Sequence, residues 1–530
     1  MTAAAASTPS APAGEAPAKA PLILTALILS ALVCNINLAS ANIALPDIGD
    51  AFGATQTQLN LVAVGCALGL AMSVMYLGAV ADRYGRKQIL LLGLSLTVIA
   101  SFLAAFSVSV EMLMAARLFT GISAGMAYPT TLSLINALWK PGAKRTLAIA
   151  LWSSISATAT VLGSITAGVL LLWFWWGSAF LVAAPIALIA LLLVWFFVPS
   201  HVAEDDRPVD HVGGVISVLM VASLVVGLST VFLPETFVLG AILLSTFVVM
   251  LVLFGWRQVK TRFPLYDLTI AKRRLFWAPA TGGLIVFGSL MGAMFVGQQF
   301  QQNILGYSTL QAALAAVPSA VGLLLVAQFS ARLVLSRGSR FTMLLGYSLV
   351  LLGFVTMLFW GENTPFWYVA LGYFFIGCGA GFAMTPASRS ITQSTPVKKV
   401  GMASATADLQ RDLGGSIMQA VLGAILAAGF AHAFGKLIAA SSEASSISAQ
   451  VTTALQASYA SALHVADQYP QYKDQILQGA SESLVSGSIA AYAVGAVAIF
   501  GGALVVGIFL PKHSKELELI QAYEKADAGV

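Results

Sequence analysis

Charged residues are scarce in this chain. Asp, Glu, Lys and Arg make up 9% of its 530 residues, whereas 58% are apolar. A soluble domain carries roughly 25% charged residues, so a soluble multidomain enzyme is excluded. The net charge of +5, spread over this length, is too small to form a nucleic-acid-binding surface. The mean hydropathy of +0.87 instead predicts a polytopic membrane protein.

Cysteine is also scarce, and motifs that would bind a metal or a nucleotide are missing. The three cysteines, Cys34, Cys66 and Cys378, lie inside apolar runs and match no metal or disulfide spacing. The phosphate-binding pattern GxxxxGK[ST] does not occur, which argues against direct drive by ATP. The five histidines lie in expected loops or tails and form no catalytic group. We therefore expect no enzyme activity, no metal and no cofactor.

Long apolar stretches dominate the rest of the chain. A membrane-spanning helix needs about 20 mainly apolar residues, and fourteen stretches qualify. The Ala/Pro/Ser-rich opening lacks the basic region of a signal peptide, so we expect the first span to stay in the mature protein. The expected spans lie roughly at 22–44, 58–80, 88–107, 112–135, 146–171, 177–198, 211–232, 236–255, 277–300, 310–332, 341–360, 365–389, 401–430 and 488–510.

The positions of Lys and Arg predict the orientation of these spans, since positively charged loops stay in the cytoplasm. With the N-terminus inside, all but four of the 27 Lys and Arg residues fall on cytoplasmic segments. Lys436 and Lys473 lie in one external loop, and Arg117 and Arg411 lie inside spans. We therefore expect an all-α membrane protein with 14 transmembrane helices and both termini in the cytoplasm.

One external connection is unusually long. Residues 431–487 are rich in Ser and Ala, with a weakly helical pattern around 448–465. A solvated surface hairpin is one interpretation of this stretch. A cover or docking surface over an exit path is the other.

The segment between the second and third spans combines a carboxylate, a glycine turn and several cations. A positive-inside stop signal would need the cations but neither the carboxylate nor the glycine spacing. Such a cluster can instead act as a latch that holds one helix bundle against another and rearranges as the bundles rock. The latch residues are Gly78, Asp82, Arg83, Gly85, Arg86 and Lys87.

This string is similar to the signature loop of the major facilitator superfamily, GxLaDrxGrkxxl. The loop Ala331-Arg332-Leu-Val-Leu-Ser-Arg337-Gly338-Ser-Arg340 resembles a degenerate second copy, which a parallel repeat of two six-helix halves would leave behind. The resemblance implies a major-facilitator fold whose halves rock around a central site. The expected parts are a disordered cytoplasmic tail (1–20), an N-terminal six-helix bundle (21–200), an inserted helix pair (201–262), a C-terminal six-helix bundle with the external loop (263–511) and a cytoplasmic tail (512–530).

Further strings resemble the fourteen-span drug:proton antiporter branch of that superfamily. They include Asn42-Ile-Ala-Leu-Pro46, Asp210-His-Val-Gly213, Pro264-Leu265, Gln302-Asn-Ile-Leu-Gly306-Tyr307-Ser308 and Leu413-Gly414-Gly415. The resemblance implies a bacterial plasma-membrane protein that exports small lipophilic or amphipathic compounds against protons. We expect it to act as a monomer among membrane lipids, with the proton gradient as its energy source.

The chain also departs from that branch. Asn37 stands where the branch usually carries an Asp in span 1, and Leu61 and Cys66 replace the usual Trp and Tyr of span 2. Asn37 could line a central cavity or satisfy a polar helix contact. The GPxxGG pattern of span 5 appears as small residues that still favour close helix packing. They are Gly163, Ser164, Ala167 and Gly168.

Ionisable residues inside spans are costly and therefore indicate function. Arg117 resembles the Arg of the RxxqG pattern in span 4, which the family implicates in proton transfer. Asp408, Arg411 and Asp412 fall in span 13 and are expected on one helix face. Two carboxylates sharing one Arg could hold or release a single proton as helices move. A structural ion triad and contact with substrate are the alternatives.

Apolar candidates for substrate contact cluster in span 9. Met291, Met294 and Phe295 suit a greasy substrate, although core packing explains them equally well, and Gln302 adds a polar group nearby. The aromatic run Trp173-Phe-Trp175-Trp176 is more typical of an interface belt than of a substrate box.

The sequence leaves several functions open. Export of lipophilic compounds driven by protons is the leading hypothesis. A lipid or cell-envelope precursor exporter of the same fold is an alternative, slightly favoured by Asn37 and the long external loop. A facilitator that works without a gradient and a non-transporting sensor or accessory subunit are the others.

Overall fold

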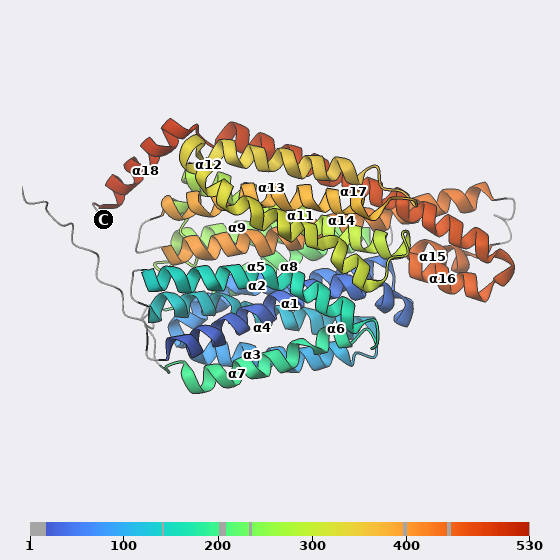
Figure 1. Cartoon of the computed structure of the whole chain (residues 1–530), viewed down its shortest axis with the longest axis horizontal. Helices are drawn as coiled ribbons and strands as arrows, with labels where there is room; N and C mark the ends of the chain where they lie inside the picture. The colour runs from blue at the N-terminus through green and yellow to red at the C-terminus, as the bar shows by residue number, and fades with distance from the viewer. Residues whose placement is uncertain are drawn as a thin grey trace, which may run out of the picture.

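A computed structural model describes residues 17, 19–139, 143–200, 208–232, 236–395, 400–441 and 447–528. All regular secondary structure in these residues is helical. The long helices run side by side in one bundle (Figure 1). The expected tail at 1–20 lies almost entirely outside the described residues.

In the described residues, the N-terminal half comprises seven helices, of which α6 and α7 together form one span. They are α1 (Ala20–Phe52), α2 (Gln56–Tyr84), α3 (Arg86–Ala105), α4 (Val110–Leu138), α5 (Ala143–Leu170), α6 (Ser178–Leu181) and α7 (Ala183–Phe197).

Apart from the four-residue helix α10, the C-terminal half is built from long helices. They are α10 (Leu268–Ala271), α11 (Arg274–Asn303), α12 (Thr309–Met357), α13 (Phe366–Gln393), α14 (Val400–Ala440) and α17 (Lys473–Phe509). The backbone of Gly338 is not helical, so α12 consists of two segments that meet at this residue.

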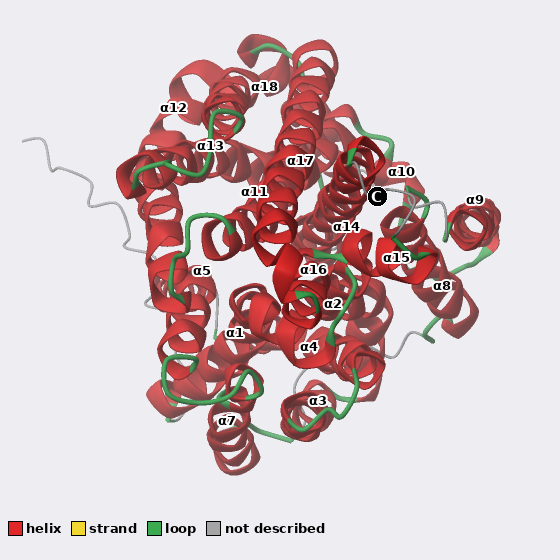
Figure 2. Ribbon diagram, turned by 90° about the vertical axis from the view of Figure 1, so that its right-hand side faces the viewer, coloured by secondary structure: helices red, strands yellow, loops and turns green. Residues whose placement is uncertain are grey.

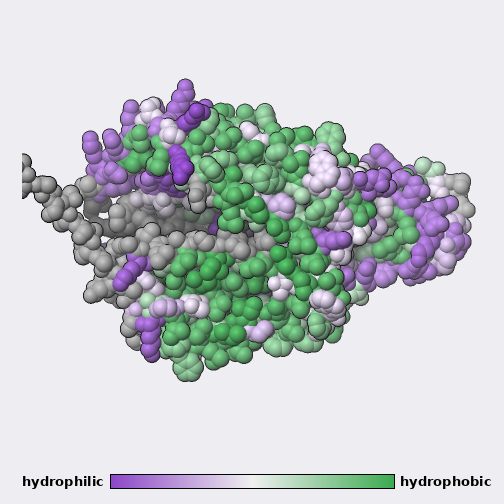
Figure 3. All heavy atoms as spheres, in the orientation of Figure 1, coloured by the Kyte–Doolittle hydropathy of each residue, from purple (hydrophilic) through white to green (hydrophobic). Residues whose placement is uncertain are grey.

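Thirteen helical stretches in the described part of the chain are long and apolar enough to cross a membrane. Each coincides with one of the expected spans. The remaining expected span, 146–171, coincides with α5, which is not among the thirteen, so the count of fourteen stays a prediction. On the face shown in Figure 3, a broad apolar band lies between two hydrophilic ends, as a protein embedded in a bilayer requires.

Two helices, α8 (His211–Thr230) and α9 (Phe237–Lys260), occupy the segment expected as the inserted pair. Asp210 joins them, because its carboxylate accepts a hydrogen bond from the Gly213 amide at 3.0 Å and pairs with Arg257 at 2.9 Å. The two partners outweigh the burial of this carboxyl, which alone would raise its pKa, and hold the pKa below its usual value. The pair lies at the side of the bundle (Figure 2), where α8 contacts α2 and α14.

The segment expected as a loop at 431–487 is largely helical. α14 continues to Ala440 and α17 begins at Lys473; between them lie α15 (Ala449–Ala457), α16 (Tyr459–Gln468) and the short helix η2 (Pro470–Tyr472). We call residues 449–472 the cap. The cap projects beyond the rest of the bundle (Figure 1), and its end of the molecule is the cap end.

The opposite end, here the termini end, holds the start of α1 and the C-terminal helix α18 (His513–Ala528) (Figure 1). The sequence predicts only a cytoplasmic tail at 512–530. The structure instead shows that most of this tail is a helix that packs on the C-terminal half, with Leu519, Ile520 and Tyr523 against its core.

Matching turns occur in the two expected halves. At the cap end, Gly53 (φ 59°) precedes α2 and Gly306 (φ 64°) precedes α12, both in the left-handed region that favours glycine. Two residues later, Thr55 and Ser308 each form a capping box with the Gln three positions on. The amide-to-hydroxyl distance is 3.2 Å in both boxes.

Candidate functional site

A polar contact from α14 joins the two halves near the middle of the bundle. Arg411 donates a hydrogen bond to the Tyr128 hydroxyl on α4 at 2.8 Å, and its guanidinium lies 5.9 Å from the centre of that ring. The two residues are 283 positions apart in the chain. Arg411 therefore connects the C-terminal half directly to the N-terminal half.

The neighbouring carboxylate faces other helices of the N-terminal half. Asp412 lies within electrostatic reach of Cys34 on α1 and of Cys66 on α2, and both thiols are buried. Cys66 also lies within electrostatic reach of Arg117. Asp412 is half-buried, and the Asp408 side chain lies outside the described residues. Arg411 and Asp412 thus reach different helices, and whether Asp408 completes the expected triad stays a prediction.

Arg117 lies at a different depth from Arg411. It is fully buried seven residues after the start of α4, about 10 Å from the cap end of that helix. Its Nε donates to the Val62 carbonyl at 3.3 Å, and its guanidinium lies 5.1 Å from the Phe180 ring centre. Its two terminal nitrogens have no partner among the described residues. Arg117 and Asp412 both lie within electrostatic reach of Cys66, and no hydrogen bond joins the two among the described residues.

Among the described residues, the hydrogen bonds between the halves lie mainly toward the cap end. Polar side chains inside otherwise apolar helices make most of them, as expected where helices associate in a membrane. The pairs are Gln56 with Gln299 at 2.7 Å, Asn42 with Gln419 at 3.0 Å, Asn60 with the Ala420 carbonyl at 3.2 Å, Gln302 with the Ile43 carbonyl at 3.2 Å and Thr309 with the Gly168 carbonyl at 3.1 Å.

The cap extends this closure. Ser458 donates to the Ala54 carbonyl at 2.8 Å, and His464 Nε2 lies 2.9 Å from the Asp50 carbonyl. Viewed onto the cap end, α16 lies over α1 and α2 (Figure 2). The cap is therefore rooted in α14 and α17 of one half and docked on the other, which favours a cover over a solvated hairpin.

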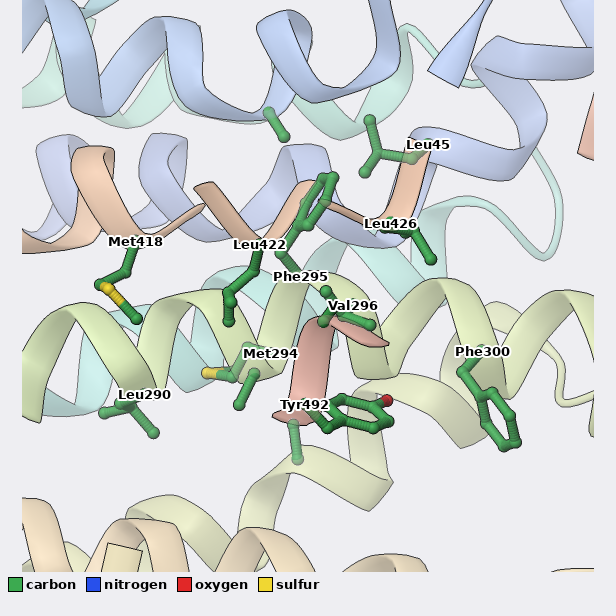
Figure 4. Packing of buried hydrophobic residues seen from close by; sticks show 14 of the residues in the cluster. Leu45, Leu290, Met294, Phe295, Val296, Phe300, Met418, Leu422, Leu426 and Tyr492 are labelled. Atoms are coloured by element: carbon green, nitrogen blue, oxygen red, sulfur yellow. The ribbon is translucent and has the colours of Figure 1, made fainter. Parts of the chain in front are cut away.

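Apolar side chains fill the interface below these polar pairs. Leu45 of α1, Phe295 of α11, and Leu422 and Leu426 of α14 have no exposed surface and belong to one core. Phe295 points toward Leu45 (Figure 4). In this arrangement the cap side of the interface is closed, and Phe295 fills it instead of lining an open cavity.

The other cavity candidates lie close to this closure. Asn37 is 2% exposed and donates to the Val33 carbonyl of its own helix at 3.2 Å. Met294 is buried, and Met291 faces α14, where its Cγ is 3.3 Å from the position that a Cβ on Gly415 would occupy. Gln302 belongs to the polar closure already described.

The expected latch forms a compact turn. Gly85 (φ 115°) separates α2 from α3, and Asp82 pairs with Arg86 at 2.8 Å across it. Lys87 donates to the Trp195 and Val198 carbonyls at the end of α7, at 2.9 and 2.6 Å. These contacts of Asp82, Arg86 and Lys87 stay within the N-terminal half, as does a 3.4 Å bond from Ser133. A contact of the latch with the other half stays a prediction.

Two further latch residues differ in what surrounds them. Open space surrounds the position of a Cβ on Gly78, so no close contact there requires glycine. Arg83 has a partner and is not a free cation.

The small residues of span 5 lie against two different helices. A Cβ on Gly163 would lie 2.9 Å from the Ile36 Cα of α1, and one on Gly168 would lie 3.0 Å from the Thr309 carbonyl of α12. Ser164 and Ala167 are buried between them. This face of α5 therefore packs closely against α1 of its own half and against α12 of the other half.

An apolar groove with a volume of about 540 Å³ opens on the outside of the N-terminal half. Phe102 of α3, Leu170 of α5 and Trp175 are among its lining residues, and none of the lining residues lies in the C-terminal half. The groove is therefore not the interface between the halves. Trp173 and Phe174 are exposed at the same rim, which favours the belt interpretation.

Sequence reasoning missed Tyr128 and the polar pairs of the closure. The available signal was the presence of Asn42, Asn60, Gln299 and Gln419 within spans, where polar side chains need partners. Nothing in the sequence shows which partner each one takes.

Comparison with known proteins places this architecture in a family. The family model described as Major Facilitator Superfamily matches residues 27–419. The chain is 32% identical over 385 residues to the multidrug efflux pump LfrA of Mycolicibacterium smegmatis, covering 72% of this chain and 75% of that protein. It is 28% identical to a triacylglyceride transporter of the same organism, covering 72% of this chain and 70% of the relative.

Solved structures show the same fold. A bacterial homologue of the human lysosomal transporter Spinster, in an inward-facing and unoccupied conformation, superposes with a TM-score of 0.62 at 16% identity. The match covers 92% of this chain and 97% of that protein.

Proposed function

We propose that this chain, which belongs to the major facilitator superfamily, is a secondary transporter that exports lipophilic or amphipathic compounds by alternating access. The named multidrug efflux relative supports this substrate class. The observation that carries the mechanism is the interface between the halves, closed toward the cap by polar pairs and an apolar core. Opening this side and closing the other would carry a substrate outward.

We further propose that protons drive this cycle through α14. Asp412 is a carboxylate at the interface, near Cys34 of α1 and Cys66 of α2. Its neighbour Arg411 holds Tyr128 of the opposite half. Neutralising Asp412 changes the charge next to the Arg411–Tyr128 contact, so proton binding and the relative position of the halves are coupled.

Reconstituted protein tests the coupling. With an imposed pH gradient, export of a fluorescent lipophilic cation from proteoliposomes should be lost in the variant Asp408→Asn/Asp412→Asn, while dye binding stays within about twofold. Asp412→Asn alone should lose most of this uphill flux. Glu111→Gln, which removes an exposed acid at the cap end of α4, is the matched control. Normal uphill export by the double variant would place the coupling site elsewhere.

A companion variant tests the departure in span 1. Asn37→Asp restores an acid on α1, four residues from Val33, to which Asn37 is bonded. It should change the pH dependence of export and leave the folded yield unchanged. An unaltered pH profile would show that this position does not face the proton path.

Lipid export is a second candidate function. The triacylglyceride transporter among the relatives supports it, and the apolar groove beside α3 offers a surface on which an acyl chain could lie. Transfer of a fluorescent triacylglycerol between leaflets, measured beside dye export in the same vesicles, distinguishes the two. Lipid transfer without dye export would replace the leading proposal.

The proposed orientation places the cap outside the cell and both termini inside, following the distribution of Lys and Arg. A cysteine replacing Gln450, in a chain without Cys34, Cys66 and Cys378, should react with an impermeant thiol reagent on intact cells. A cysteine replacing Leu268 should react only after permeabilisation. The opposite pattern would invert the orientation.

A further inference from the structure

The two halves contain equivalent turns at the termini end. Gly85 (φ 115°) separates α2 from α3, and Gly338 (φ 86°) separates the two segments of α12. We call these turns the first and second elbows. Aligning the two glycines places Leu335 at the position of Asp82 and Ser339 at the position of Arg86. The second elbow therefore lacks both members of the first elbow's ion pair.

A carboxylate from another helix lies at the second elbow. The Ser339 amide donates to Glu516 Oε2 at 3.0 Å, and the Ser339 hydroxyl donates to Glu516 Oε1. Glu516 belongs to α18, 177 positions away in the chain, and is 5% exposed. Because Ser339 opens the second segment of α12, the carboxylate satisfies an otherwise unpaired amide and lies at the favourable end of the helix dipole.

The elbow and α18 fit closely together. A Cβ on Gly338 would lie 2.9 Å from His513 Cβ and 3.0 Å from Glu516 Oε2, so only glycine leaves room for this helix. The Ser390 hydroxyl of α13 donates to the Ser339 hydroxyl at 3.0 Å. Glu516 thus fastens α18 to the elbow and, through Ser339, to α13.

The far end of α18 is held by a second carboxylate. Arg273, just before α11, binds both oxygens of Asp527 at 2.9 and 2.6 Å and donates to the Ser394 carbonyl at 2.6 Å. Its guanidinium also lies 4.8 Å from the Tyr523 ring centre. The hydrogen bond to Asp527 raises the pKa of Arg273, so this anchor stays charged. α18 therefore crosses the ends of α11, α12 and α13.

We infer that Glu516 is a positioning residue of the transport cycle: α18 supplies to the second elbow, from a distant part of the chain, the carboxylate that the first elbow carries as Asp82. The consequence is that α18 keeps the two segments of α12 and the adjoining end of α13 in one rigid unit while the halves move. This inference rests on the proposed export function, and its test has one readout that does not need export.

The first experiment measures amide hydrogen exchange in residues 336–345 of the full-length protein in detergent. Glu516→Ala should speed exchange there by about tenfold, the loss expected when a helix cap is removed. Glu516→Gln keeps an acceptor for Ser339, so its exchange rate should lie between those of wild type and Glu516→Ala. Glu518→Ala, on an exposed position of the same helix, is the control and should match wild type.

The second experiment asks whether an acid within the elbow can replace the distant one. In the Glu516→Ala chain, Leu335→Asp returns a carboxylate to the position that Asp82 occupies in the first elbow. Because Asp82 bonds the Arg86 side chain and no amide of α3, the new acid should act on the start of the helix through its charge and recover part of the lost exchange protection. In proteoliposomes, Glu516→Ala should lower the maximal export rate about tenfold with unchanged substrate KM, and Leu335→Asp should restore much of that rate.

The outcomes separate the two claims. Wild-type exchange in Glu516→Ala would overturn the inference, and so would failure of Leu335→Asp to recover protection. Altered exchange with a normal export rate would limit Glu516 to a structural role and would also overturn it. If the wild-type protein exports no probe, the proposed function fails while the exchange result still stands. If Glu516→Ala does not fold, Glu516→Gln carries the same comparison.

Discussion

The two ends of the repeat have diverged to different degrees. At the cap end, the turns before α2 and α12 keep both the left-handed glycine and the Ser/Thr–Gln capping box. At the termini end, the two elbows keep the glycine but differ in chemistry. Asp82 sits within the first elbow with 47% of its side chain exposed, whereas Glu516 reaches the second elbow from α18 and is buried.

This difference shows which property each glycine turn requires. Backbone geometry is imposed by the sharp change of direction between two helices, so the glycine persists. The carboxylate needs only to lie at the start of the helix that follows the turn. It can therefore belong to a distant element that extends to that position. An exposed acid is suited to forming and breaking contacts during a cycle, while a buried one is suited to holding a joint.

Replacing the elbow glycines should give the largest effects. Gly338→Ala adds a left-handed strain of about 1–3 kcal/mol and also pushes against His513, so its thermal midpoint in detergent should fall more than that of Gly85→Ala. At Gly85 the nearest atom to a new Cβ is the end of the flexible Gln88 side chain.

Deleting residues 513–530 sharpens this comparison. In the shortened chain, the backbone strain alone should destabilise the Gly338→Ala variant. Its fall in thermal midpoint should then match that of Gly85→Ala. An equal loss of stability at Gly338 with and without α18 would contradict close packing at the second elbow.

Asp82→Asn should lower the export rate about tenfold while the thermal midpoint stays unchanged. The pair with Arg86 is partly exposed and contributes less than about 1 kcal/mol to stability, but its loss leaves Arg86 without its carboxylate partner. Initial export rates in vesicles with matched protein content provide the measurement. Asp82→Glu is the control that keeps the charge, and a normal rate in Asp82→Asn would remove the latch from the cycle.

Removing the hydroxyl that faces each acid should give a smaller and unequal effect. Ser339→Ala deletes a buried donor to Glu516 and should cost about 1–2 kcal/mol of unfolding free energy. Ser133→Ala deletes a 3.4 Å contact to the half-exposed Asp82 and should cost less than about 0.5 kcal/mol. Thermal melting of the two purified variants side by side tests the order, which reverses if Asp82 is the more tightly held acid.

Arg273→Lys should produce the smallest effect, limited to one end of α18. Lysine replaces the two-pronged contact with Asp527 by a single one. Exchange in residues 521–528 should rise a few-fold, while the Ser339 amide stays protected, because the two anchors are 11 residues or about 17 Å apart on α18. Loss of protection at both ends together would show that α18 detaches as one piece.

Hydropathy located the spans because a membrane imposes the same length and polarity on every helix that crosses it. The glycine and charge pattern also located the first elbow. The cap is harder to predict: its Ala- and Ser-rich helices contain no apolar span, and only the weak periodicity around 448–465 indicates them.

The second elbow and the central contacts depend on distant partners. The sequence predicts only a cytoplasmic tail around Glu516, although Leu519, Ile520 and Tyr523 follow it at helical spacing and could have indicated a packed face. Arg411 and Asp412 are expected to act together, but they contact different helices. Arg411 bonds Tyr128 and Asp412 lies near Cys34, and both helices are nearly 300 positions away or more in the chain. No local pattern contains that information.

The cap also bears on pharmacology. At 41 residues, α14 is about 60 Å long, twice the roughly 30 Å hydrocarbon core of a bilayer, so it carries the cap well clear of the lipid. In the proposed orientation, the seam where Ser458 meets Ala54 faces the medium. If the proposed export function holds, a binder that separates α16 from α1, or holds the two together, would act on the transporter from outside the cell.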